Sequence, residues 1–183
     1  MATAVAPATG FVVTVPEAEP LVAALRSRFD PSAAVDVPAH ITVLYPFMPP
    51  AQLTPEVLAR AAGALRGLDP FSFTLARVRR FPGVLYLAPE PSAPFVAMTE
   101  ALVQAFPAFP PFGGVHDRIV PHLTVAQGDE QLLQQADAEL HAALQLHGPV
   151  SVRCRELQLL RNVDGRWHQW QRLALPGQEA STP

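Results

Sequence analysis

Apolar and polar residues alternate along several short segments of the chain, and apolar residues recur at helical spacing in the segments between them. Strict alternation indicates a half-buried strand, whereas apolar residues three and four positions apart indicate an amphipathic helix. Prolines lie mostly at the ends of these segments and mark their boundaries. The pattern predicts strands at residues 11–15, 39–43, 71–79, 84–87, 121–125, 150–160 and 167–175, and helices at residues 18–29, 54–68, 94–106 and 129–146.

The order of these elements repeats along the chain. Residues 10–80 and 83–161 each follow the order strand, helix, strand, helix, strand. Either half alone would bury too little apolar surface to be stable by itself. We therefore expect one domain over residues 10–175, built from two interleaved lobes about an approximate two-fold axis, with disordered tails at residues 1–9 and 176–183.

The second strand of each half carries the same short motif. The first reads Ala-His-Ile-Thr-Val and the second reads Pro-His-Leu-Thr-Val. In an extended strand alternate side chains project to the same face, so His40 lies beside Thr42, and His122 lies beside Thr124. Because the two motifs occupy matching places in the repeat, we expect both polar pairs to face one central cleft.

Composition narrows the class of ligand. The net charge is −3, and all 13 basic residues are arginines. Such a chain lacks the broad basic surface that holds a nucleic-acid duplex, although an arginine cluster can bind one or two phosphates. We expect a small nucleotide or RNA-end substrate, with neither duplex nucleic acid nor a membrane as partner.

Cysteine usage and hydropathy indicate the compartment. The single cysteine, Cys154, cannot form an internal disulfide, and no basic-then-apolar leader opens the sequence. Charged residues and prolines interrupt every apolar stretch before the roughly 20 residues that a membrane span requires. We expect a soluble, cytoplasmic protein that acts as a monomer.

Two histidines and two threonines suit acid–base chemistry at phosphorus. An imidazole titrates near pH 6.5 when unperturbed, so one ring can accept a proton while the other donates one at neutral pH. Threonine hydroxyls beside the rings can donate hydrogen bonds to phosphoryl oxygens. The pattern favours cleavage of a phosphoester without a metal ion.

Other catalytic chemistries fit the sequence less well. Catalytic zinc usually needs three protein ligands, and neither pair has a carboxylate or a second histidine at metal-ligand spacing. The chain has no Gly-x-Ser-x-Gly nucleophile motif, and without lysine it cannot form the usual Gly-rich phosphate loop. Cys154 lies in an alternating segment and is interpreted as a small core residue. We expect no metal and no cofactor.

The two motifs resemble those of the two-histidine (2H) phosphoesterase superfamily, in particular its 2′-5′ RNA ligase-like and cyclic phosphodiesterase branch. The segments Phe-Pro-Gly-Val-Leu-Tyr-Leu-Ala-Pro at 81–89 and Phe-Gly-Gly at 112–114 are also similar to bacterial members, and the resemblance covers about residues 10–175. It implies an α+β fold: a bilobal, duplicated β-α-β-α-β arrangement in which two antiparallel sheets flank a central cleft.

The resemblance also implies roles for the motif residues. His40 and His122 would be the acid–base pair, and Thr42 and Thr124 would donate hydrogen bonds to the phosphate. By analogy, His122 would activate water and His40 would protonate the leaving oxygen. One departure concerns specificity, because several RNA-processing members carry arginine after the second motif where this chain has Gln127.

The resulting hypothesis is a metal-independent phosphodiesterase acting on 2′,3′-cyclic phosphate or 2′-5′-linked nucleotides and RNA ends. Two alternative functions fit the same residues. The chain could bind a phosphorylated nucleotide without turnover, or it could join RNA ends in a 2′-5′ ligation that reverses the same chemistry.

Four further residues are candidate substrate contacts. Tyr45 continues the first motif strand, and Tyr86 lies on the strand that opens the second half. Arg118 and His116 precede the second motif in a Gly-rich loop. Trp167, by contrast, is expected to anchor the final strand.

Overall fold

The computed structural model describes residues 8–115 and 118–176, and these residues form two antiparallel four-stranded sheets. The strand order is β2-β1-β7-β8 in the first sheet and β5-β4-β3-β6 in the second. The first sheet contains β1 (Thr9–Thr14), β2 (His40–Leu44), β7 (Glu156–Val163) and β8 (Arg166–Ala174). The second contains β3 (Phe71–Phe81), β4 (Val84–Glu90), β5 (Leu123–Gln127) and β6 (Val150–Cys154).

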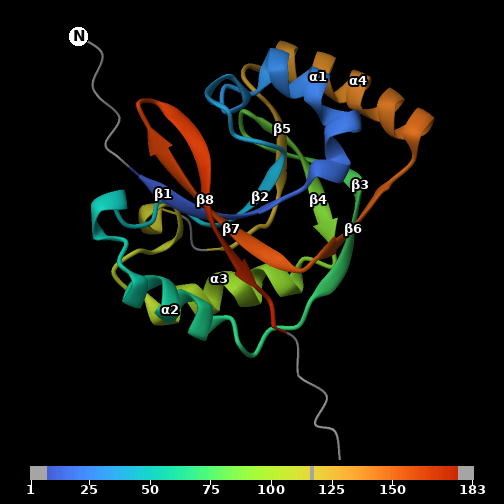
Figure 1. The fold of residues 1–183 in the computed structure, drawn as a ribbon. Coiled ribbons are helices and arrows are strands. Elements are labelled where there is room, and N and C mark those ends of the chain that lie inside the picture. The colour runs from blue at the N-terminus through green and yellow to red at the C-terminus, as the bar shows by residue number, and fades with distance from the viewer. Residues whose placement is uncertain (1–7, 116–117, 177–183) are drawn as a thin grey trace, which may run out of the picture.

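Helices cover the sheets in two pairs. They are α1 (Glu19–Phe29), α2 (Pro55–Ala64), α3 (Ala93–Ala105) and α4 (Glu130–His147). Helices α1 and α4 contact each other and β5, whereas α2 and α3 contact each other and lie against β8 and β2 respectively. Figure 1 shows the two pairs at opposite ends of the molecule, with the strands between them.

This arrangement confirms the duplicated, bilobal α+β fold. In each half, the helix that follows the first strand crosses to the other sheet: α1 packs on β5, and α3 packs on β2. The two sheets therefore share their covering helices, which is why neither half could bury its own apolar surface alone.

Two helix starts follow from their capping residues. The Thr54 hydroxyl accepts a hydrogen bond from the Val57 N–H at 3.4 Å, and Pro55 occupies the first helical position of α2. The Asp129 carboxylate accepts the Leu132 N–H at 2.9 Å and begins α4.

The predicted strand at residues 150–160 is in fact two strands. Residues up to Cys154 form β6, which pairs with β3, and residues from Glu156 form β7, which pairs with β1 in the other sheet. Arg155 is the crossing point, and its carbonyl accepts the Leu175 N–H at 2.8 Å. The alternation of buried and exposed positions shifts by one at this point: Val152 and Cys154 are buried before it, and Leu157 and Leu159 after it. Two consecutive polar residues, Arg155 and Glu156, mark the change of sheet in the sequence.

The predicted tails need one adjustment. Thr9, placed in the N-terminal tail, is the first residue of β1; it is fully buried, and its hydroxyl donates to the Met48 carbonyl at 2.7 Å. Residues 1–7 and 177–183 lie outside the described part of the chain. Within the described part, no helix has both the length and the apolar character needed to cross a lipid bilayer.

Cys154 is a core residue, as expected. Its side chain is buried, and burial raises the pKa of the thiol to about 11. A thiol that stays protonated at neutral pH is a poor nucleophile, which agrees with the interpretation of Cys154 as a packing residue.

Candidate active site

The two motif strands meet at the centre of the molecule. Strand β2 is the edge of the first sheet, β5 is the edge of the second, and the two strands contact each other. Along β2 the fully buried Ile41 separates the partly exposed His40 and Thr42, and Leu123 separates His122 and Thr124 in the same way. The predicted alternation is therefore present at both motifs, and it brings the two pairs to adjacent edges.

The two histidines are held by the same hydrogen bond. The Nδ1 atom of His40 lies 2.8 Å from the Pro38 carbonyl oxygen, and the Nδ1 atom of His122 lies 2.7 Å from the Val120 carbonyl oxygen. A carbonyl can only accept, so each neutral ring carries its proton on Nδ1. The Nε2 atom of each ring is left with the basic lone pair.

Burial holds both rings in the neutral form. The pKa of His40 is lowered to about 4, chiefly by desolvation; the charges of Arg26 and His122 also lower it, while the Pro38 hydrogen bond and Asp30 raise it. Desolvation also lowers the pKa of His122, against the Val120 hydrogen bond. The charge of His122 makes the smallest of these contributions at His40, which agrees with the contact between the two motif strands.

The lowered pKa of His40 predicts acid-sensitive stability. The unfolded chain protonates a histidine near pH 6.5, whereas folded His40 is protonated only near a pKa of about 4. Between these values the unfolded state binds more protons, so the free energy of unfolding falls as the pH is lowered. Urea unfolding at about pH 7 and about pH 5 measures the effect, and His40→Gln should make the dependence shallower. An equally steep dependence in that variant would contradict the assignment to His40.

A cavity of about 220 Å³ lies beside His40. Thr42 and Tyr45 line it, so Tyr45, a candidate substrate contact, lies at the cavity beside the first motif. Trp167 lines the same cavity, and its ring meets the Tyr45 ring edge-on at a centroid distance of 5.7 Å. The sequence pattern predicts only that Trp167 anchors the last strand, because nothing in the sequence shows that the β7–β8 hairpin reaches the first motif.

A larger cavity of about 680 Å³ lies beside His122. Arg118, a predicted contact, lines it. Phe81 and Phe112 line it as well, although no pattern in the sequence marks them as site residues. The second motif is thus bordered by aromatic rings and one cation. The predicted contact His116 falls outside the described residues.

Tyr86 lies behind His122, where it is largely covered. It is 6% exposed, stacks on Phe81 at a centroid distance of 4.3 Å and meets the His122 ring at 5.3 Å. Burial raises the pKa of its phenol. The structure therefore places Tyr86 against the histidine ring, while Val84 of the same strand is among the residues that line the cavity.

Gln127 makes a contact inside the protein. Its side-chain amide donates to the Asp30 carboxylate at 3.2 Å. Asp30 ends α1 and is 3% exposed, so this bond links the end of the second motif strand to the helix that precedes the first motif.

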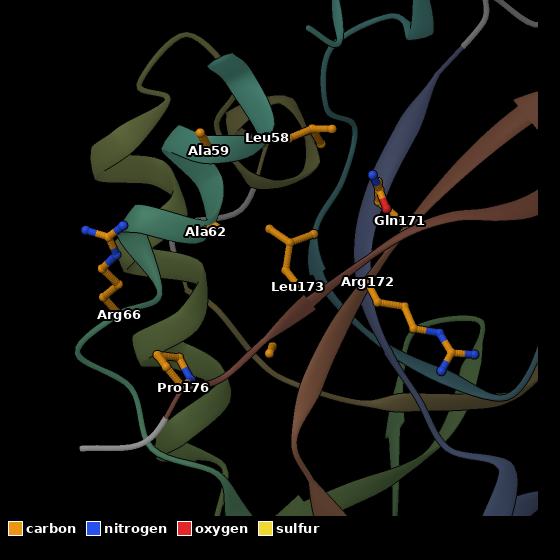
Figure 2. A pocket seen from close by; sticks show the side chains of 9 residues that line it. Leu58, Ala59, Ala62, Arg66, Gln171, Arg172, Leu173 and Pro176 are labelled. Atoms are coloured by element: carbon orange, nitrogen blue, oxygen red, sulfur yellow. The ribbon is translucent and has the colours of Figure 1, made fainter. Parts of the chain in front are cut away.

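Another cavity, of about 410 Å³, lies away from both histidines between α2 and β8. Figure 2 shows Leu173 between the two elements, with Arg66 and Arg172 pointing away from each other. The cations do not converge, so this cavity lacks the geometry for a phosphate. In the described ranges, no group of three His, Cys, Asp or Glu side chains could hold a metal ion.

The two-motif arrangement agrees with the match of this sequence to a protein-family model. The model of the 2′-5′ RNA ligase superfamily matches residues 14–166. The chain belongs to this superfamily. The match spans both motifs, so the central strands of this 2′-5′ RNA ligase superfamily member lie inside the shared region. None of the curated proteins compared with the chain matches it significantly.

Solved structures show the same fold at low sequence identity. LigT of E. coli in complex with 3′-AMP is 15% identical with a TM-score of 0.59, over 92% of this chain and 98% of that chain. LigT in complex with NADP+ is 17% identical with a TM-score of 0.56, over 93% and 99%. TT0787 of Thermus thermophilus is 19% identical with a TM-score of 0.59, over 93% and 99%. These likenesses place the superfamily member in the LigT-like fold.

Proposed function

We propose that this 2′-5′ RNA ligase superfamily member is a metal-independent phosphodiesterase that cleaves 2′,3′-cyclic phosphates or 2′-5′-linked nucleotides, including RNA ends. One observation carries the proposal: His40 and His122 lie on contacting edge strands, and each has Nδ1 tied to a carbonyl. This arrangement supports a single site with two basic Nε2 atoms. In-line displacement at phosphorus needs such a pair, one ring for the attacking oxygen and one for the leaving oxygen.

In the proposed reaction, His122 accepts a proton from water as the water oxygen forms a bond to phosphorus. The bond from phosphorus to the ester oxygen breaks on the opposite side, and His40 gives its proton to that oxygen. The hydroxyls of Thr42 and Thr124 donate hydrogen bonds to the non-bridging oxygens, whose negative charge increases in the transition state.

The acid requires a proton that the ligand-free protein does not hold at neutral pH. Burial keeps both imidazoles neutral, most strongly at His40. A phosphate anion beside the ring favours the charged form and raises its pKa. The substrate is therefore expected to bring His40 into its protonated state, so that binding takes up a proton.

The two cavities provide room for the groups on either side of the phosphate. Tyr45 and Trp167 border the cavity at His40, and Phe81 and Phe112 border the cavity at His122. Aromatic side chains can stack on nucleobases. LigT of E. coli has been crystallised with 3′-AMP and with NADP+, which supports a small nucleotide as the ligand class here.

A panel of substrates tests the proposal. The purified chain, with and without EDTA, is incubated with 2′,3′-cyclic nucleotides, 2′-5′-linked dinucleotides and 3′-5′-linked dinucleotides, and the products are separated by chromatography. We expect ring opening or 2′-5′ cleavage that EDTA does not reduce. Ligand-induced thermal stabilisation without product would indicate a binding module instead, and joined RNA ends would indicate ligation.

A further inference from the structure

Helix α1 carries a buried ion pair next to the first motif. Arg26 is 3% exposed, and its Nε donates to the Asp30 carboxylate at 3.0 Å. Its terminal nitrogen donates to the Val37 carbonyl at 2.9 Å and to the Ser32 hydroxyl at 3.2 Å. A buried pair of this kind often adds little stability compared with apolar residues of the same size. Its contacts suggest a role in holding the segment that leads to His40.

Glu19, the first residue of the same helix, binds this segment directly. Its Oε1 accepts the Ala39 N–H at 2.7 Å and lies 3.9 Å from the Arg26 guanidinium. The Ala39 N–H and the Pro38 carbonyl belong to one planar peptide unit. That carbonyl accepts the Nδ1 proton of His40 at 2.8 Å. Glu19 therefore holds one side of the same peptide unit whose other side holds the histidine ring.

We propose that Glu19, steadied by Arg26, is a positioning residue: it fixes the Pro38–Ala39 peptide so that Nδ1 of His40 stays protonated and Nε2 stays basic. The consequence for catalysis rests on the proposed function, whereas the effect on the His40 tautomer does not. Glu19 touches no reacting atom in this scheme and acts through the peptide and the ring.

The peptide that holds the His122 ring is fixed in a different way. The carbonyl that holds His122 belongs to the Val120–Pro121 peptide, and Pro121 has no N–H that a carboxylate could grip. The Pro121 ring is buried, so packing holds this peptide. The difference between Ala39 and Pro121 at matching positions of the two motifs thus explains why only the first needs an acceptor such as Glu19.

The test compares variants by nitrogen-15 NMR of the imidazole rings at neutral pH, where long-range couplings distinguish the two neutral tautomers. We expect Glu19→Ala to give His40 a substantial Nε2–H population. Glu19→Gln keeps an acceptor oxygen and should retain the Nδ1–H tautomer. Glu17→Ala is the matched control, because it removes the same charge from an exposed position two residues away.

Kinetics gives the second readout. We expect Glu19→Ala to lower kcat by about 10- to 100-fold with little change in KM, because the ring is misplaced while the substrate is still bound. Glu19→Gln should restore kcat. Should Glu19→Ala fold poorly, Glu19→Asp keeps the charge near Arg26 but withdraws the carboxylate from Ala39, and it should show the same two effects.

The outcomes separate the two proposals. An unchanged His40 tautomer in both Glu19→Ala and Glu19→Asp would overturn the positioning role, even if kcat fell. A changed tautomer in a chain whose wild type turns over no substrate would support the positioning role and reject the phosphodiesterase.

Discussion

His40→Ala and His122→Ala are each expected to lower kcat/KM for a cyclic nucleotide by about 10²- to 10⁴-fold, the usual contribution of a general acid or base. Each ring is the only proposed proton carrier for its side of the phosphorus. Each ring lines a cavity instead of packing in the apolar core, so its loss should leave the fold intact, as circular dichroism can confirm. The double variant should be little worse than either single variant, because the two groups act in one step.

His141→Ala is the control for this series. His141 is exposed on α4, where it pairs with Asp137, so its replacement should leave kcat/KM unchanged.

The pH dependence of kcat/KM gives a further check. The profile of kcat/KM for the wild type should be bell-shaped, with its acid limb below pH about 6.5, because burial lowers the pKa of both site histidines. Full activity in either site variant would exclude the two-histidine mechanism.

Asp30→Ala is expected to reduce the free energy of unfolding by about 3–5 kcal/mol, because it removes the buried carboxylate that contacts the Arg26 guanidinium at 3.0 Å and leaves only the more distant Glu19. The Asp30 carboxylate also accepts hydrogen bonds from the Ser32 N–H and hydroxyl, at 3.0 and 2.8 Å, and from Gln127 at 3.2 Å. Urea unfolding followed by circular dichroism measures the loss.

A surface ion pair on the same helix provides the comparison. Arg28 binds Glu139 through two hydrogen bonds of 2.6 and 3.0 Å, with both side chains more than a third exposed. Glu139→Ala should therefore lower the free energy of unfolding far less than Asp30→Ala does. An equal loss in the free energy of unfolding for Asp30→Ala and Glu139→Ala would show that the buried pair stabilises the protein no more than the surface pair does.

The fold and the central pairs were predictable because they rest on local periodicity. Alternation of polar and apolar positions put His40 with Thr42, and His122 with Thr124, on one face of each strand, and the structure has both faces as predicted. The repeated order of elements identified the two halves. Contact between β2 and β5 then follows from the way in which the halves share their helices.

The supporting contacts were not predictable, because they join residues far apart in the sequence. Arg26 and Asp30 have the spacing of an ordinary surface ion pair on a helix, and only the fold buries them. Gln127 reaches Asp30 across 97 positions. Trp167 lies at the first cavity because the β7–β8 hairpin carries it there, a contact between residues far apart in the sequence.

In the proposed mechanism the two motifs form one site that breaks a phosphodiester bond without a metal ion. Phosphorus NMR of a nucleoside 2′,3′-cyclic monophosphate, incubated in EDTA with the wild type and with the His40→Ala/His122→Ala double variant, tests it most directly. We expect a monoester resonance to replace the cyclic ester resonance with the wild type only. A cyclic resonance that persists with the wild type, or disappears equally fast with the double variant, would contradict it.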